Sequence, residues 1–223
     1  MHSDVELPLW VRALRMCSGS QYRWSRTVRL LLALSIGSCS RPASIRIAVV
    51  FSTTWAFESL NQADQAVVKR AALDTLRQAF DGFDVVFAET PAGDRTIRIE
   101  DTPYASNPTQ LISFGAAGVT YPAAMMSSVR HDVLFNAELA AVRCSKVNEC
   151  TKTRTELIEA LGRGIGATAA HELGHQTGFG FSHDWPCVEC YDGKSSTAYV
   201  HFFGVKHWSD QAVRRMRQVL PRK

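Results

Sequence analysis

The sequence predicts a mixed α/β domain in which a twisted sheet packs on two helices. Short segments rich in β-branched residues alternate along the chain with two long helical patterns. The composition is ordinary for a globular protein, with 46% hydrophobic and 21% charged residues. The 223 residues suffice for one domain, and no repeat or linker divides them. A globular α/β (α+β) domain is therefore expected.

The first half of the chain supplies most of the sheet. Residues 44–51, 84–89 and 96–100 are β-branched or alternate in polarity, which predicts three strands. Between the first two, residues 61–80 carry apolar side chains at helical spacing, which predicts an amphipathic helix that ends at Asp81-Gly82.

The next segment is a predicted loop followed by a strand. Residues 101–127 are rich in Pro, Gly and Ala, and we expect a short strand only over 118–121. Residues 129–135 alternate, which predicts another strand with His131 on its exposed face.

Two helices are expected in the second half. A capping box at 153–156 opens a long helix over 153–177, with Gly178 as its stop. Ser209 caps a last helix over 209–220. The long helix contains three glycines that are costly in a helix interior, and we expect close packing on the sheet to compensate: Gly162, Gly164 and Gly166.

Residues 1–39 have the features of an export leader. Arginines precede a short apolar run over 30–37, which is the pattern of a secretory signal. The run ends in Ile-Gly-Ser-Cys, which resembles a bacterial lipobox and implies lipidation of Cys39. Met16 is an alternative start, which would make the preceding residues a misassigned extension. We expect an exported protein, either a lipoprotein of the envelope or a periplasmic or secreted one.

An oxidising compartment changes how the remaining cysteines are interpreted. The four cysteines after the leader predict two disulfides. Local pairing, Cys144 with Cys150 and Cys187 with Cys190, is the simplest arrangement. A disulfide between the two loops is the alternative.

The charge of the chain argues against nucleic-acid partners. The formal net charge is +4, but the leader holds a surplus of arginines, and residues 39–223 contain 20 basic and 19 acidic side chains. A nearly neutral body offers no electrostatic footprint for nucleic acid. Membrane contact is expected only through a lipid anchor.

The end of the long helix carries the chemistry. His171-Glu172-Leu173-Gly174-His175 is an HExxH motif. Residues i and i+4 share one helix face, so both imidazoles can bind one zinc ion. Glu172 lies about 100° round the helix and can reach a zinc-bound water as general base.

The residues that follow the HExxH motif extend it into a longer signature. Residues 171–178 resemble the first part of the metzincin signature, HExxHxxGxxH/D. Metzincins are zinc endopeptidases, and the resemblance implies a zincin-like fold with one catalytic zinc ion and a peptide or protein substrate. It also implies a single domain over 40–223, with an upper part over 43–178 and a small, irregular C-terminal subdomain over 179–223.

The chain departs from the family pattern at two places. The third ligand falls on Phe181, which cannot bind zinc, so we expect His183 instead, with Asp184 as the alternative. The family's methionine beneath the metal is missing, and Tyr191 stands near its place. The cysteine pair after the third ligand is distantly similar to that of archaemetzincins, which leaves the subfamily open.

These observations predict an exported zinc endopeptidase in which a zinc-bound water attacks the peptide carbonyl. An edge strand around 115–121 would bind extended peptide by backbone pairing. Tyr191 or Tyr199 is a candidate donor to the oxyanion. One alternative is an inactive, zinc-stabilised binding or surface-interaction domain. Another is a peptidase with a different acidic zinc ligand, either of gluzincin type with Glu189 or of aspzincin type with Asp184 or Asp192.

Overall fold

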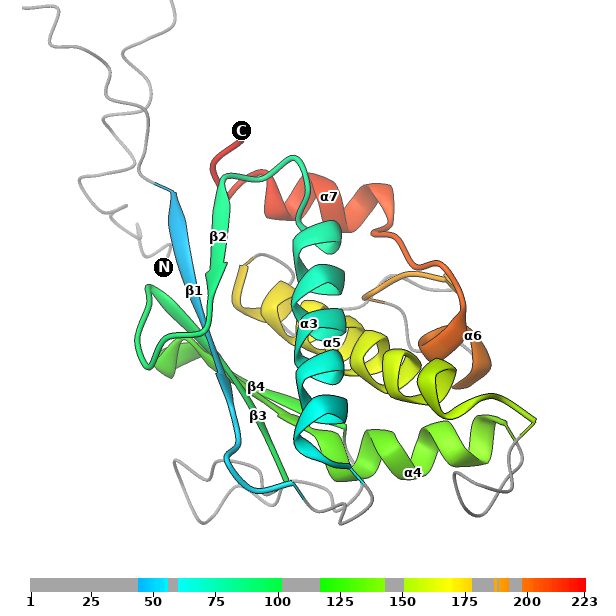
Figure 1. Ribbon diagram of the computed structural model, residues 1–223. Coiled ribbons are helices and arrows are strands. Elements are labelled where there is room, and N and C mark those ends of the chain that lie inside the picture. The colour runs from blue at the N-terminus through cyan, green and yellow to red at the C-terminus, as the bar shows by residue number, and fades with distance from the viewer. Residues whose placement is uncertain are drawn as a thin grey trace, which may run out of the picture. The chain divides into compact units, whose positions relative to one another are not determined.

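The computed structural model describes seven parts of the chain: residues 44–55, 60–101, 117–142, 151–177, 187, 189–192 and 198–223. The elements are, in order, β1 (Ile45–Phe51), α3 (Gln62–Ala79), β2 (Val85–Ala88), β3 (Arg95–Glu100), β4 (Gly118–Tyr121), η1 (Pro122–Ala124), β5 (Met126–Arg130), α4 (His131–Ala141), α5 (Arg154–Thr177), α6 (Ala198–Phe203) and α7 (Asp210–Met216). Among these elements, all the strands precede α4 in the chain, with only α3 and the short η1 between them, and the remaining helices follow (Figure 1).

The five strands form one mixed sheet in the order β2-β1-β3-β5-β4. Strand β1 pairs in parallel with β2 and β3, and β3 pairs in parallel with β5. Strand β4 is antiparallel to β5 and lies at the edge. The predicted mixed α/β class is confirmed, and the short strand expected at 118–121 is this edge strand.

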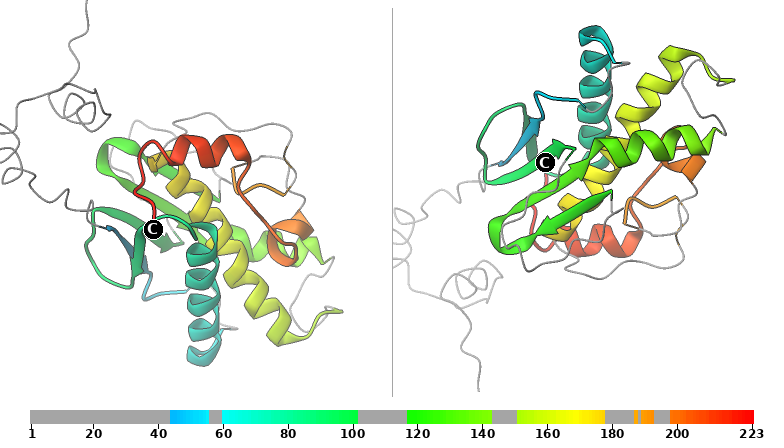
Figure 2. Two further views of the ribbon diagram at one scale, coloured as in Figure 1. Left: turned by 90° about the horizontal axis from the view of Figure 1, so that it is seen from above. Right: turned by 90° about the horizontal axis from the view of Figure 1, so that it is seen from below.

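The core lies between the sheet and the helices. In β3, Ile97 and Ile99 are fully buried while the alternate residues are partly exposed, so one face of the strand points to the core. Helices α3 and α5 pack against each other and cross at an angle (Figure 2). Helix α5 also contacts β3, β4 and β5, which places its C-terminal end beside the edge strand.

Two of the three glycines of α5 lie close to a different element from the one expected. A Cβ on Gly162 would lie 2.6 Å from the Ala71 Cβ and from the Val68 carbonyl oxygen, and both belong to α3. A Cβ on Gly166 would lie 2.6 Å from the Ala72 carbonyl oxygen, also in α3. The close approach is therefore between two helices, and the predicted approach to the sheet is wrong for these positions.

The strand predicted over 129–135 is also wrong. Strand β5 ends at Arg130, and His131 begins α4. The His131 ring is fully buried and stacks on Trp55, with ring centroids 4.6 Å apart, so its predicted exposure is wrong as well. Burial lowers the pKa of His131.

The helix caps follow from the sequence. Asn61 and Asp64 form a capping box at the start of α3. The Ser209 hydroxyl accepts a hydrogen bond from the backbone N–H of Ala212, which caps α7 as expected. Among the described residues, none of the helices has the length and apolar character needed to cross a membrane.

Candidate active site

The last two turns of α5 carry the HExxH residues. His171 and His175 are partly buried, and Glu172 is 7% exposed. Their helix is packed on β4 and β5 on one side and on α3 on another, which fixes its axis. Of the three residues, Glu172 lies directly against the edge strand, where it contacts Gly118 and Thr120.

A backbone carbonyl sets the tautomer of His171. The His171 Nδ1 atom lies 2.6 Å from the carbonyl oxygen of Tyr191. A carbonyl oxygen only accepts, so Nδ1 carries the proton and donates. The Nε2 atom is then left with a lone pair, which is the form of imidazole that binds a metal.

The two imidazoles converge at their Nε2 atoms. These atoms lie 3.1 Å apart, and the rings are nearly perpendicular at 84°. Two nitrogen ligands of a tetrahedral zinc ion at 2.0–2.1 Å are about 3.3 Å apart. The pair thus fits zinc both in spacing and in the tautomer of His171.

Glu172 is held by the edge strand. The Thr120 hydroxyl donates to Glu172, with Oγ1 2.6 Å from Oε2 and 2.9 Å from the backbone carbonyl oxygen. Burial raises the pKa of Glu172 to about 7, and the hydrogen bond from Thr120 opposes that rise. The carboxylate is therefore a buried group with one fixed donor.

Gly118 makes room for this carboxylate. A Cβ at position 118 would lie 2.6 Å from Glu172 Oε1 and 2.7 Å from its Cγ. Real Cβ atoms do not approach other atoms so closely, so any other residue would displace the Glu172 side chain. The sequence predicts a substrate-binding strand here, but no pattern in it indicates that this glycine contacts the acid.

A polar network ties the same helix end to the sheet. The Gln176 side-chain amide donates to Ser127 Oγ at 2.6 Å and to the Thr96 carbonyl oxygen at 3.3 Å. Arg95 donates to the Gln176 carbonyl oxygen at 2.6 Å. A cation at a helix C-terminus also complements the helix dipole. The last turn of α5 is consequently fixed to β3 and β5.

The two candidate tyrosines lie in different surroundings. Tyr191 is 4% exposed, its ring packs against Trp208 at 5.0 Å between centroids, and its contact with His171 is made by the backbone. Tyr199 is 50% exposed and stacks on Phe203. A hydroxyl role for either tyrosine stays a prediction.

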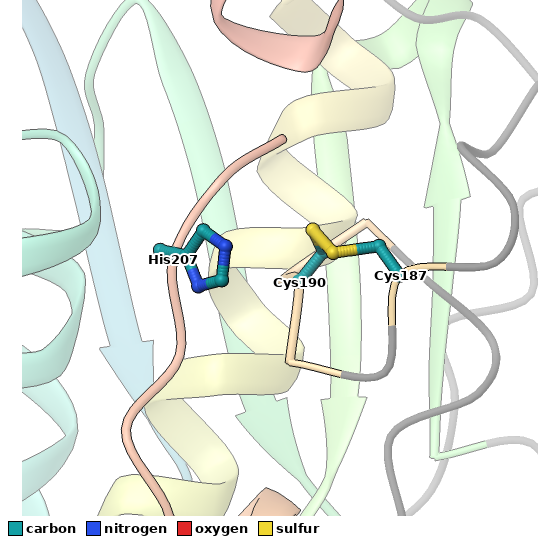
Figure 3. Close-up of side chains that lie close together, drawn as sticks. All are labelled: Cys187, Cys190 and His207. Atoms are coloured by element: carbon teal, nitrogen blue, oxygen red, sulfur yellow. A yellow bond between two sulfur atoms is a disulfide. The ribbon is translucent and has the colours of Figure 1, made fainter. Parts of the chain in front are cut away.

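A disulfide lies next to Tyr191. Cys187 and Cys190 are joined, and His207 lies opposite them (Figure 3). The donor atoms of these three residues lie within 4.8 Å of one another. Metal ligation by cysteine requires thiolates, so the disulfide form of this group is not a metal site.

Several predicted residues lie outside the described parts of the chain. They are the third-ligand candidates His183 and Asp184, the lipidation candidate Cys39, and the cysteines Cys144 and Cys150. Their roles stay predictions. Two further acids considered as alternatives, Glu189 and Asp192, are described, and Asp192 is fully buried and accepts a hydrogen bond from Ser209.

Comparison with known proteins gives a distant likeness only. No family model and no curated protein match the sequence. A solved structure of archaemetzincin from Methanopyrus kandleri is 14% identical, with a TM-score of 0.47 over 81% of this chain and 97% of that chain. A zinc-dependent peptidase from Methanocorpusculum labreanum is 12% identical, with a TM-score of 0.44 over 77% of this chain and 100% of that chain. At such low sequence identities and TM-scores, any function of this chain has to be inferred from the residues of its own site.

Proposed function

We propose that this chain is a zinc-dependent endopeptidase of metzincin type. The observation that carries the proposal is the pair of Nε2 atoms 3.1 Å apart, with the His171 tautomer fixed by a carbonyl and an acid one residue away. A structural metal site has no use for the acid, whereas hydrolysis needs a base. His171 and His175 would hold the ion, with His183 or Asp184 as the third ligand. Zinc supplies a Lewis acid that acidifies water and polarises a carbonyl.

Glu172 is proposed as the proton carrier of the reaction. Its carboxylate lies on the helix that presents both imidazoles, and Thr120 holds one of its oxygens. Glu172 would take a proton from water during attack and give it to the amine that leaves. Each of these transfers needs the carboxylate in a fixed position, which Thr120 and Gly118 provide.

The edge strand is proposed as the substrate platform. Strand β4 pairs with β5 along one side, and among the described strands it is the last of the sheet on the other side. An extended peptide adds to such an edge through backbone hydrogen bonds. Because Gly118 and Thr120 also touch Glu172, a peptide on β4 would pass close to the acid.

Metal dependence tests this function. Full-length protein would be stripped with a chelator and titrated with zinc while cleavage of a denatured protein is followed by mass spectrometry. We expect about one zinc ion per chain at the site, with activity lost on stripping and restored by zinc. The variants His171→Ala and His175→Ala should lose both zinc and activity. Unchanged cleavage by stripped protein would contradict the proposal.

Export is a separate proposal that rests on residues 1–39. Metabolic labelling with a fatty acid in a bacterial host would compare the wild type with Cys39→Ala. Label on the wild type alone would support the lipid anchor. A processed protein without label in both would support free export, and an unprocessed cytoplasmic protein would contradict export.

A further inference from the structure

The contact that sets the tautomer of His171 comes from a short, heavily constrained segment. Tyr191 follows Cys190 directly, and Cys190 is joined to Cys187. The Tyr191 carbonyl oxygen accepts from His171 at 2.6 Å. Only one peptide unit thus separates the disulfide-bonded residue from the group that orients the metal ligand.

The other side of the segment is fixed by backbone pairing. The Tyr191 N–H donates to the His207 carbonyl oxygen at 2.9 Å, and the His207 N–H donates to the Glu189 carbonyl oxygen at 3.1 Å. The next residue, Trp208, packs on the Tyr191 ring and donates from its indole to the Ala79 carbonyl oxygen at 2.6 Å. The segment that pairs with Tyr191, at His207 and Trp208, is therefore anchored to the end of α3.

We propose that the Cys187–Cys190 disulfide is a positioning element for the HExxH site, and that its reduction weakens zinc binding by releasing the Tyr191 carbonyl from His171. The proposal rests on the proposed function, because it takes His171 as a metal ligand. It assigns a role in the site to two cysteines that do not touch the metal.

The size of the disulfide loop indicates a local effect. The two cysteines are three residues apart, so their cross-link restricts the unfolded chain far less than a long loop would. In the folded protein the main effect of the cross-link is therefore to fix the orientation of the backbone at Tyr191, the residue after Cys190. Loss of a hydrogen bond to a metal-bound histidine typically lowers metal affinity tenfold to a hundredfold.

The disulfide is accessible from one side. Cys187 is partly exposed, whereas Cys190 is fully buried. A phosphine would attack the Cys187 sulfur, break the S–S bond and release the Cys190 thiolate, which takes up a proton. With a phosphine, water then frees the Cys187 thiol and the phosphine leaves as its oxide. Two thiols are formed, and one phosphine is oxidised.

The test compares zinc affinity with and without the disulfide in the full-length chain. The double variant Cys187→Ser/Cys190→Ser lacks both the cross-link and the thiolates that would otherwise bind extra zinc. Competition with a chromogenic chelator would give the dissociation constant. We expect tenfold to hundredfold weaker zinc binding in the variant than in the oxidised wild type, and a phosphine should leave the zinc affinity of the variant unchanged.

A control separates positioning from general destabilisation. Asn61→Ala removes the cap of α3 and lowers the melting temperature without touching the segment 187–192. It should leave zinc affinity unchanged. In metal-free protein, nitrogen NMR of the His171 ring should report a proton fixed on Nδ1 in the oxidised wild type. That fixed proton should be lost on reduction and regained on reoxidation, which remains measurable if the double variant does not fold.

The outcomes distinguish this inference from the proposed function. If the oxidised wild type binds zinc, the double variant binds it equally well and reduction leaves the His171 ring signals unchanged, the inference is wrong and the proposed function stands. If the oxidised wild type binds no zinc, the proposed function fails and the inference fails with it.

Discussion

The hydroxyl of Thr120 holds the carboxylate of Glu172, with 2.6 Å between Oγ1 and Oε2. Thr120 lies in the edge strand β4 and Glu172 in the helix α5, so this contact joins the proposed substrate platform to the proposed base. Ser127 of β5 helps to hold the Thr120 hydroxyl in position, since the two hydroxyl oxygens lie 3.0 Å apart. The acid is therefore oriented by the sheet as well as by its own helix.

Replacing Thr120 by Val should slow catalysis. Val keeps the shape and the strand preference but removes the donor to Glu172. We expect kcat to fall about tenfold with little change in KM, and a cost of about 1–3 kcal/mol in unfolding free energy, because a buried carboxylate oxygen loses its partner. Steady-state kinetics and chemical unfolding measure both. Thr120→Ser retains the hydroxyl and should recover most of kcat; equal losses in Ser and Val would contradict the role of the hydroxyl.

Replacing Gly118 by Ala should displace the same acid by steric contact. The new Cβ would lie 2.6 Å from Oε1, and a flexible carboxylate moves more readily than backbone. We expect kcat/KM to fall tenfold or more, while zinc affinity and melting temperature change little. Isothermal titration with zinc and a peptide assay would check this. Full activity in the variant would mean that Glu172 has more room than the structure shows.

The third metal ligand can be assigned by a pair of variants. His183 and Asp184 are neighbours in the chain, so each serves as the control for the other. We expect His183→Ala to weaken zinc binding by at least a hundredfold and Asp184→Ala by much less, because imidazole is the better zinc ligand of the two. The reverse order of the two dissociation constants would assign Asp184.

Acid should destabilise the fold through His201. Its Nε2 lies 3.1 Å from the Gly164 carbonyl oxygen, and Lys206 Nζ lies 3.1 Å from its Nδ1, so the ring is neutral. Burial and the Lys206 charge lower the pKa of His201 to about 3, below its ordinary value of 6.5. Its stability contribution is therefore present above pH 6.5 and is lost as the pH falls towards 3.

The magnitude of this loss is limited by the linkage relation. We expect the unfolding free energy to fall by at most about 1.4 kcal/mol per pH unit below pH 6.5 through this group. Unfolding in urea between pH 7 and pH 4.5 measures the slope. In His201→Gln the slope should be smaller, since the side chain cannot titrate; an identical slope in both proteins would rule out His201 as its source.

Local patterns predicted the first three strands, the short strand at 118–121 and both long helices, and they failed at α4. Residues 129–135 alternate in polarity and so favour a strand, yet the buried residues His131, Leu134 and Glu138 are spaced as on one helix face. Two of these three are polar, which hid the pattern. Glu138 is 1% exposed, and burial raises its pKa to about 8. Residues 131–141 therefore form a helix because of tertiary packing, against the local pattern of polarity.

Part of the candidate site could likewise be predicted from the sequence, and part could not. The HExxH spacing is a property of the side chains and could be found in the sequence. The Tyr191 carbonyl that fixes the His171 tautomer is a backbone group, which any residue supplies, so no residue type marks it. Gly118 and Thr120 were part of a predicted edge strand, but their contact with Glu172 spans more than fifty positions and depends on how α5 packs on β4.

Glu172→Gln tests the central claim most directly. Full-length wild type and variant, with equal measured zinc content, would digest the same denatured casein, and the products would be identified by mass spectrometry. Gln keeps the size of the side chain but cannot accept the proton. We predict cleavage by the wild type and a rate at least a hundredfold lower in the variant. Equal cleavage by the two proteins would contradict Glu172 as the general base.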